Sequence, residues 1–466
     1  MKIPLFLTRP RALALFVCAV ARAAEPRPPN LLLLFADNLG YADLGCYGNA
    51  AVQTPHLDRL AADGVRCTDF YIGAPSCAPS RGAILTGRHP ERTGFNYQSI
   101  RYARIPAKAA VAGLGLPRTE KIIPHFLKPL GYATGAFGKW NVGFHPGGRP
   151  TERGFDEFLG FEGGNINYYT HAYGGQNDMR RGTEPVDLSG RYTTDLFADS
   201  AIDFIRRNRD RPWFVYLPFN AVHSVLPGTR ATGEKFSFQV PAPALARYGL
   251  GPDEPDSKKR FLAVLTALDD AIGRVLKTVD DLGQRERTVV LFVSDNGAFI
   301  NMIAGSGTGE QSNAPLRSGS HHTYEGGLRV PAIFRWPGRL KPGTICREML
   351  STLDVLPMLV RAAGGALPRD LVLDGRDPTP ALAGETPSPH AALHWSYASG
   401  AKEHWQAMRE GPLKIVRSAR TAPWELYDLA RDVSETTDLA MSRPDAVAAL
   451  AGKYERWHAA VQPAAR

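Results

Sequence analysis

Short, continuous runs of apolar residues alternate along the chain with longer amphipathic stretches. Asn30–Ala36 and Thr288–Ser294 are almost wholly apolar and have the length of a buried strand. Residues 132–137 and 213–217 are similar runs between them, and residues 261–282 have helical spacing just before the last of these runs. Such alternation is typical of a mainly parallel sheet covered by helices. The pattern therefore predicts an α/β fold.

The last part of the chain has a different pattern. After the proline-rich stretch 386–389, several short segments of strand length follow one another, and residues 445–461 have helical spacing. The short segments span residues 394–397, 405–409, 413–417 and 424–429. They predict a small antiparallel sheet closed by a helix. We therefore expect a large domain over residues 24–385 and a small C-terminal α+β domain over residues 386–466.

Residues 1–23 have the pattern of a secretory signal peptide. Basic residues precede the apolar run 12–20, and the small residues Ala21 and Ala23 follow it. The run is too short to span a bilayer, and no later stretch of the sequence approaches transmembrane length. We expect cleavage after Ala23 and a periplasmic or secreted protein without a transmembrane segment.

The formal net charge of +9 belongs partly to this leader. Its four basic residues are accompanied by no acidic residue, so the mature chain would carry +5. That excess favours anionic partners only mildly, and no block of Lys and Arg is present. We therefore expect no nucleic-acid partner.

Four scattered cysteines remain after the leader: Cys46, Cys67, Cys77 and Cys346. They are too few in a chain of this length to form a disulfide scaffold. If Cys77 has a chemical role, the remaining three cannot all pair with one another. We expect them to be mostly buried thiols.

Polar and charged residues follow four of the predicted strands at their carboxyl ends. They are Asp37, Asn38, Lys139, His223, Asp295 and Asn296. Ligands of open α/β sheets bind at this edge. One such residue alone is usually a cap or a turn residue, but four convergent cases favour a shared site.

The two Asp-Asn pairs supply only oxygen ligands, which Ca²⁺ and Mg²⁺ prefer, whereas Zn²⁺ favours His and Cys. If Arg81, Lys139 and His223 converge on the same edge, they would hold a tetrahedral oxyanion beside such a cation. This combination predicts transfer of a sulfuryl or phosphoryl group. A plain Cys77 thiolate explains the site less well, because no His-Asn arrangement and no Cys-x5-Arg phosphate loop accompanies it.

The stretch Cys77-Ala78-Pro79-Ser80-Arg81, followed by Leu85-Thr86-Gly87-Arg88, resembles the signature of the type I sulfatases of the alkaline phosphatase superfamily. In that family the Cys is oxidised after translation to Cα-formylglycine, whose hydrated aldehyde attacks the sulfur. The resemblance implies a formylglycine-generating enzyme as a partner during maturation. It also implies an alkaline-phosphatase-like mixed sheet sandwiched by helices, with a smaller C-terminal antiparallel-sheet domain.

The resemblance extends over nearly the whole mature chain. Residues 35–48 and 294–297 are similar to the two metal segments of the family, and residues 323–331 and 426–429 are similar to further family stretches. Residues 165–171 resemble the N-acetylgalactosamine-4-sulfatase branch. By position, the family would bind one Ca²⁺ through Asp37, Asn38, position 77, Asp295 and Asn296, and would place Arg81, Lys139 and His223 around the sulfate.

Three positions depart from the family pattern. Asn38 stands where Asp is usual, Asn141 where a basic His is usual, and Ser320 where a sulfate-binding Lys is usual. Asn141 cannot accept a proton at neutral pH, and Asn38 removes an anionic ligand of the metal. The neighbouring His321 or His322 would replace the lost cation, and His321 is a candidate acid or base.

The changes at positions 38 and 320 cancel in charge, which favours a retuned enzyme over a decaying one. We therefore expect hydrolysis of a sulfate ester, on a carbohydrate or an aryl group, by a formylglycine at position 77 with one bound Ca²⁺. Two alternatives stay open. One is a phosphodiesterase or phosphonate hydrolase of the same superfamily, because fold alone does not define function. The other is a catalytically impaired protein that binds sulfated glycans.

Overall fold

The protein is described by a computed structural model of residue 1 and residues 27–97, 115–231, 233–300, 310–398 and 404–462. The predicted signal peptide therefore lies outside the described residues, apart from Met1. Within the described part of the chain, every helix is too short or too polar to cross a membrane.

A mixed sheet runs through the large N-terminal part of the chain. Among the described residues it has ten strands, in the order β13 (Thr344–Cys346), β2 (Val65–Cys67), β12 (Ala332–Arg335), β11 (Thr288–Ser294), β1 (Asn30–Ala36), β10 (Trp213–Pro218), β4 (Ala133–Lys139), β5 (Glu157–Phe161), β8 (Met179–Arg181) and β9 (Glu184–Pro185). The central strands β11, β1, β10, β4 and β5 are all parallel, whereas β12 and β8 join them antiparallel. The four strands expected from the apolar runs are confirmed and lie side by side.

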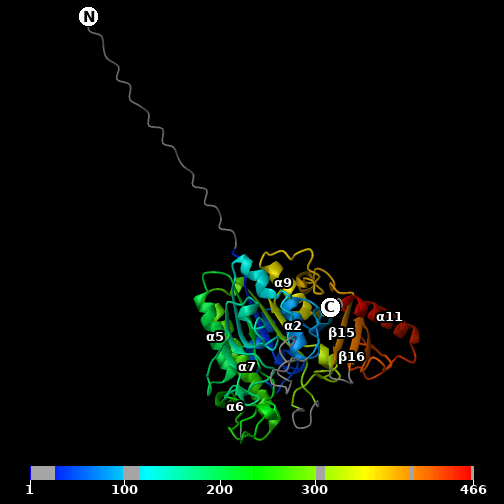
Figure 1. Ribbon diagram of the computed structural model, residues 1–466, viewed down its shortest axis with the longest axis horizontal. Coiled ribbons are helices and arrows are strands. Elements are labelled where there is room, and N and C mark those ends of the chain that lie inside the picture. Colours follow the sequence, from blue (N-terminus) through cyan, green and yellow to red (C-terminus); the bar gives the residue numbers. More distant parts are fainter. Residues whose placement is uncertain (2–26, 98–114, 232, 301–309, 399–403, 463–466) are drawn as a thin grey trace.

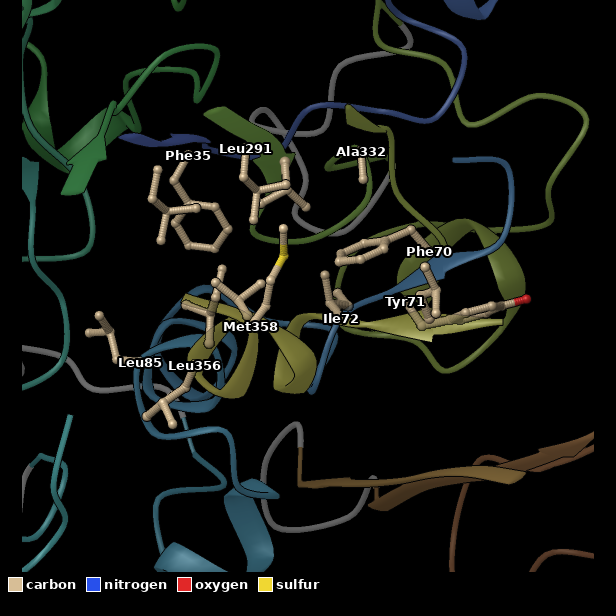
Figure 2. Packing of buried hydrophobic residues seen from close by; sticks show 14 of the residues in the cluster. Phe35, Phe70, Tyr71, Ile72, Leu85, Leu291, Ala332, Leu356 and Met358 are labelled. Atoms are coloured by element: carbon tan, nitrogen blue, oxygen red, sulfur yellow. The ribbon is translucent and has the colours of Figure 1, made fainter. Parts of the chain in front are cut away.

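Side chains of the central strand β1 alternate between two separate cores, as the period of a strand requires. Leu31, Leu33 and Phe35 belong to a core that includes side chains of α2 (Cys77–Thr86), α4 (Ile123–Leu127) and α9 (Val355–Ala362). Figure 2 shows part of this core, where Met358 of α9 points toward Phe35 and Leu291 of the sheet. Helices α2, α4 and α9 therefore cover one face of the sheet, as expected.

The opposite face of the sheet is covered by a second set of helices. Leu32 and Leu34 belong to a core with side chains of α1 (Pro55–Ala62), α5 (Thr193–Arg207), α6 (Ala242–Ala246) and α7 (Ser257–Asp281). Helices α5, α6 and α7 lie together on one side of the molecule (Figure 1). Helix α7 confirms the helix expected over residues 261–282 and begins four residues earlier, where Asp256 accepts hydrogen bonds from the amides of Lys258 and Lys259.

The remaining elements are short. The helices α3 (Pro90–Thr93), α8 (Glu325–Leu328) and α10 (Thr379–Leu382) are each a single turn. Two small pairs of strands lie outside the main sheet: β14 (Leu350–Ser351) with β3 (Phe70–Tyr71), and β6 (Ala172–Tyr173) with β7 (Gln176–Asn177).

The C-terminal part forms a second sheet, as expected. Its described strands are β15 (Ala392–Ala398), β16 (His404–Glu410), β17 (Leu413–Arg417) and β18 (Glu425–Asp428), all antiparallel, followed by α11 (Pro444–Val461). This unit lies at the end of the molecule remote from α5 (Figure 1). Trp395, Ala407 and Val416 nevertheless pack into the same core as β1 and α9. The division of the chain at residue 385 stays a prediction.

A buried ionic group ties the two parts together. The Lys414 ammonium on β17 lies 2.8 Å from Glu325 Oε1 on α8 and 3.0 Å from Glu435 Oε1. The side chains of all three residues have no exposed surface in these pairs. Buried charges of this kind cost little only while they stay paired.

Replacing Lys414 by Met should therefore leave the buried carboxylates of Glu325 and Glu435 without the ammonium group that they share. We expect the free energy of unfolding to fall by about 3–5 kcal/mol, measured by guanidinium denaturation of the full mature chain. Lys453→Met is the matched control, because Lys453 pairs with Glu410 on the surface at 44% and 34% exposure. It should cost less than about 1 kcal/mol. Equal losses for the two variants would contradict a special role for the buried group.

Candidate active site

The carboxyl ends of four neighbouring strands meet at one edge of the main sheet. Strands β11, β1, β10 and β4 are adjacent and parallel, so the residues that follow them gather there. Asp37 follows β1 and Asp295 follows β11. Lys139 is the last residue of β4, which continues through Gly138 beyond the apolar run seen in the sequence. His223 follows β10 after a short turn.

Cys77 is the first residue of helix α2 and points at this edge. Its sulfur lies 3.5 Å from Asp37 Oδ1, 3.5 Å from Asn296 Oδ1 and 3.8 Å from Asn38 Oδ1. Burial, and then the charge of Asp295, raise the pKa of the Cys77 thiol well above its usual value. An unmodified Cys77 is therefore a protonated thiol, which is a poor nucleophile.

Two buried cations pair with the two buried carboxylates. Arg81, one turn after Cys77 on α2, donates two hydrogen bonds to Asp295 Oδ2, at 2.7 and 3.1 Å. It also donates to the carbonyl oxygen of Lys139 at 3.1 Å. The Lys139 ammonium lies 2.5 Å from Asp37 Oδ2. Burial opposes the charge of Lys139, but the Asp37 carboxylate and the other acidic groups around it together outweigh burial, and the pKa of Lys139 is raised.

The oxygen atoms of this cluster suit a metal ion. One ligand atom each of Asp37, Cys77 and Asp295 lie within 4.8 Å of one another. The amides of Asn38 and Asn296 complete the group, and Asn296 Nδ2 donates to Asn38 Oδ1 at 2.5 Å. Burial and the nearby Asp37 raise the pKa of Asp295, so a cation between the two carboxylates would relieve their repulsion. Buried carboxylate and amide oxygens are the donors that hard divalent cations prefer.

His223 is held on the rim of the cluster. Its Nδ1 lies 2.8 Å from Asn165 Nδ2 and 2.7 Å from the Ser224 carbonyl oxygen. Burial, followed by the charge of Lys139, lowers the pKa of His223 to about 3. Its ring stacks on Phe299, with centroids 6.1 Å apart. The imidazole is therefore neutral at neutral pH and fixed in orientation.

The structure also locates the positions that depart from the family pattern. Asn141 is buried with a left-handed backbone, φ 49°, and its Nδ2 has no hydrogen-bond partner among the described residues. The Ser320 hydroxyl donates to the Pro75 carbonyl oxygen at 3.3 Å, in the turn that leads into Cys77. His322, the other candidate replacement for the missing cation, contacts Ser318 and the Trp405 ring.

His321 lies on the Cys77 side of this loop. Its amide donates to the same Pro75 oxygen at 2.6 Å, and its Nδ1 lies 3.1 Å from the Tyr397 hydroxyl of β15. Its φ of 71° is uncommon outside glycine, and residues held in this way concentrate at functional sites. Burial lowers the pKa of His321 to about 4, so the ring is neutral at neutral pH.

Three residues near the site were not assigned to it from sequence. Phe299 stacks on His223 and meets His321 edge to face, Tyr397 reaches His321 from the C-terminal sheet, and Asn165 contacts His223. Asn165 stands in a family-like stretch, which is a weak signal. Tyr397 and Phe299 carry no sequence signal, because their roles arise from packing between distant segments.

The structure is that of an α/β protein whose buried oxygen atoms and cations at one sheet edge suit a hard cation and an oxyanion. A family model described as "Sulfatase" matches residues 29–366, and one described as "N-sulphoglucosamine sulphohydrolase, C-terminal" matches residues 320–451. The chain belongs to the sulfatase family and is a sulfuric ester hydrolase.

Relatives across this family support the assignment. The chain is 34% identical to arylsulfatase A of Homo sapiens, an alignment that covers 94% of this chain and 89% of the relative. It is 34% identical to N-acetylgalactosamine-6-sulfatase of Canis lupus familiaris, over 80% of this chain and 69% of the relative. It is 33% identical to steryl-sulfatase of Mus musculus, over 81% and 71%.

Solved structures confirm the expected alkaline-phosphatase-like fold. Ps i-CgsB in complex with k-i-k-neocarrahexaose has a TM-score of 0.80 and 28% identity, with 93% of each chain covered. The phosphonate monoester hydrolase of Agrobacterium radiobacter has a TM-score of 0.63 and 20% identity, covering 93% of this chain and 96% of that one. The second likeness shows the fold alone.

The strained backbone at position 321 predicts that its side chain matters for turnover rather than for folding. His321→Gly should remain folded, because relief of a left-handed conformation offsets about 1 kcal/mol of lost contacts. Its kcat/KM for a sulfate ester should fall at least about tenfold. His171→Gly, at φ 57° and bonded to Arg191, is the control and should keep its activity. The measurements are thermal unfolding and sulfate release, and full activity of His321→Gly would contradict the prediction.

Proposed function

We propose that the protein removes sulfate from a sulfated carbohydrate by means of a Cα-formylglycine formed at Cys77 and one bound Ca²⁺. The position of Cys77 carries this proposal. Its sulfur contacts Asp37 and Asn296 at the first residue of α2, while Arg81 and Lys139 both lie beside the Asp37 carboxylate. As a protonated thiol it is a poor nucleophile, so the position gains a chemical role once the thiol has been converted.

Four oxygen donors would hold the calcium ion, together with the group at position 77. They are the side chains of Asp37, Asn38, Asp295 and Asn296. When bound, Ca²⁺ would supply positive charge next to the sulfate oxygens, and the hydrated formylglycine would supply the attacking hydroxyl. This role assignment rests on the buried oxygen cluster and on the family resemblance.

The remaining residues would bind and orient the ester. Arg81 and Lys139 are held by buried carboxylates, so little reorganisation is needed when an anion arrives. His223, neutral and fixed against Phe299, would contact an ester oxygen as a hydrogen-bond donor. Ser320 would contribute through its hydroxyl to the turn before Cys77 rather than as a charge.

Asn141 cannot serve as a base, and His321 is the residue we assign in its place. The ring of His321 lies between Phe299 and Tyr397. Burial lowers its pKa to about 4, so the ring is neutral at neutral pH and would act as a weak base through its unprotonated nitrogen. Asn141 would act only as a hydrogen-bonding amide. In this assignment the site has a base, which comes from the loop that carries His321 and not from position 141.

The substrate class and the maturation route are part of the proposal. The named relatives include an N-acetylgalactosamine-6-sulfatase, and Ps i-CgsB is solved with k-i-k-neocarrahexaose, which supports a sulfated carbohydrate. A formylglycine-generating enzyme would act on the chain during export. The leader over residues 1–23 would direct the protein to the periplasm or out of the cell.

The proposal is tested first by mass spectrometry of the peptide that contains position 77, on protein co-expressed with a converting enzyme. We expect the mass of an aldehyde in place of the thiol, and hydrolysis of sulfate esters in preference to phosphate esters. Cys77→Ala should lose turnover by several orders of magnitude, since it removes the nucleophile. Activity on phosphate or phosphonate esters alone would favour the other hydrolase class. Glycan binding by converted but inactive protein would favour a binding role.

The oxygen cluster also predicts how the metal responds to one added charge. Asn38→Asp keeps the acceptor oxygen that bonds Asn296 and adds an anionic ligand. We expect Ca²⁺ to bind about tenfold more tightly, because charge on the ligands raises affinity for hard cations, as measured by calorimetry on metal-free protein. Asn177→Asp, on an exposed strand, should change nothing. If Asn38→Asp binds Ca²⁺ with unaltered or weaker affinity, Asn38 is not a ligand of the metal.

A further inference from the structure

Cys67 and Cys346 lie opposite each other on two neighbouring strands. Cys67 is the last residue of β2 and Cys346 is the last residue of β13. The two strands are parallel, and their register pairs Cys346 with Cys67. Both side chains belong to the same core, so they lie on the same face of the sheet. They are buried free thiols in the structure, as expected from the sequence, and neither takes part in the proposed chemistry.

The pair has the separation that a disulfide requires. Neighbouring strands lie about 4.8 Å apart, and the Cα atoms of disulfide-bonded cysteines are usually about 4.4–6.8 Å apart. The thiol of Cys67 donates a hydrogen bond to the sulfur of Cys346, so the two side chains point toward each other. The amide of Thr68 donates to the Cys346 carbonyl oxygen at 2.9 Å, which holds the two strand ends together. A bond between the two sulfur atoms is therefore compatible with the strand pairing.

The two thiols differ in access and in acidity. Cys67 has no exposed surface, whereas Cys346 lines a surface cavity of about 620 Å³ together with residues of β13 and α10. The hydrogen bond from Cys67 lowers the pKa of Cys346, while burial raises the pKa of Cys67 well above its usual value. Because the thiolate is the reactive form of cysteine, Cys346 is the thiol of the pair that an external reagent reaches and reacts with first.

We propose that Cys67 and Cys346 form a disulfide once the protein has left the cytoplasm. The sulfur of Cys346 attacks the disulfide of an external thiol–disulfide oxidoreductase, whose S–S bond breaks, and the first thiol of the oxidant leaves with the proton of Cys346. The sulfur of Cys67 then attacks that of Cys346, and the second thiol of the oxidant leaves with the proton of Cys67. The two cysteines thus lose two electrons and two protons, which the oxidant gains. This inference rests on the export that is part of the proposed function, because disulfides persist in oxidising compartments.

The disulfide leaves Cys46 and Cys77 as the free thiols of the mature chain. Burial raises the pKa of Cys46 to about 12 and raises that of Cys77 well above its usual value, so both thiols stay protonated and exchange slowly. Cys346 is the cysteine of the four whose pKa is lowered. Its bond to Cys67 therefore removes the most reactive thiol that could form a wrong disulfide with position 77 before conversion.

The direct test is peptide mapping by mass spectrometry, without reduction, of full-length mature protein isolated from the periplasm or the culture medium. Free thiols are alkylated in denaturant before digestion. We expect the peptides that contain Cys67 and Cys346 to be joined and Cys46 to be alkylated. Alkylation of both Cys67 and Cys346 would overturn the proposal. If the protein is not exported, that part of the proposed function fails, and treatment of the purified chain with excess glutathione disulfide decides whether the pair forms.

Single substitutions distinguish a disulfide from two packed thiols. In Cys67→Ala, Cys346 keeps its access to the cavity but loses its partner, so glutathione disulfide should leave a glutathione adduct on Cys346, which the wild type should not carry. In Cys346→Ala, the buried Cys67 should stay a thiol. If Cys346 stays unmodified in Cys67→Ala, no oxidant reaches it, and the proposal is overturned.

Thermal unfolding provides a second readout. Reduction by dithiothreitol should lower the Tm of the exported wild type by about 4 °C or more, because it releases the unfolded chain from a long closed loop. The same treatment should leave the Tm of Cys67→Ala unchanged. Cys46→Ala is the matched control and should respond to reduction as the wild type does. A wild-type Tm that does not respond to reduction would contradict a bond between Cys67 and Cys346.

Discussion

The ion cluster formed by Arg81, Lys139, Asp37 and Asp295 is the constraint on which the site and much of the fold depend. All four side chains have no exposed surface. Arg81 belongs to α2 and Lys139 to β4, and Asp37 and Asp295 directly follow β1 and β11. Charges buried in this way are tolerated only when paired and hydrogen-bonded. Arg81 therefore fixes α2 against the sheet edge through Asp295, and α2 in turn fixes Cys77. These contacts therefore neutralise the buried charges and also determine where the side chain of Cys77 lies.

The charge balance of this cluster has a chemical consequence. Its two cations and two carboxylates cancel, so together they offer no net attraction to a sulfate ester. A divalent cation among the oxygen donors would make the site positive and would offset both the burial and the repulsion from Asp37 that raise the pKa of Asp295. Asn38 and Ser320 leave this balance as it would be with Asp and Lys at those positions. The neutral side chains at positions 38 and 320 thus change the affinity of the site for its ligands more than they change its total charge.

The sequence predicts those features that local pattern determines. The buried strands at Asn30–Ala36 and Thr288–Ser294 follow from continuous apolar runs, and the polar residues after them follow from the chemistry of strand ends. The end of β4 is less visible, because Gly138 interrupts the apolar signal although the strand continues to Lys139. The contacts of Asn165 and Tyr397 were not predictable, since they join segments more than fifty residues apart. Only the tertiary packing brings such side chains together.

Backbone conformation explains how the site accommodates its unusual residues. Asn38, Asn141 and His321 all have a left-handed backbone, with φ of 60°, 49° and 71°. Asn, Asp and His are the residue types other than glycine that adopt this conformation most readily. Exchanges among them at positions 38 and 141 therefore change the ligand or the base without disturbing the turn that carries it. The backbone imposes the conformation, and a small set of polar side chains is free to vary within it, so that the chemistry at this sheet edge can be altered while the fold is kept.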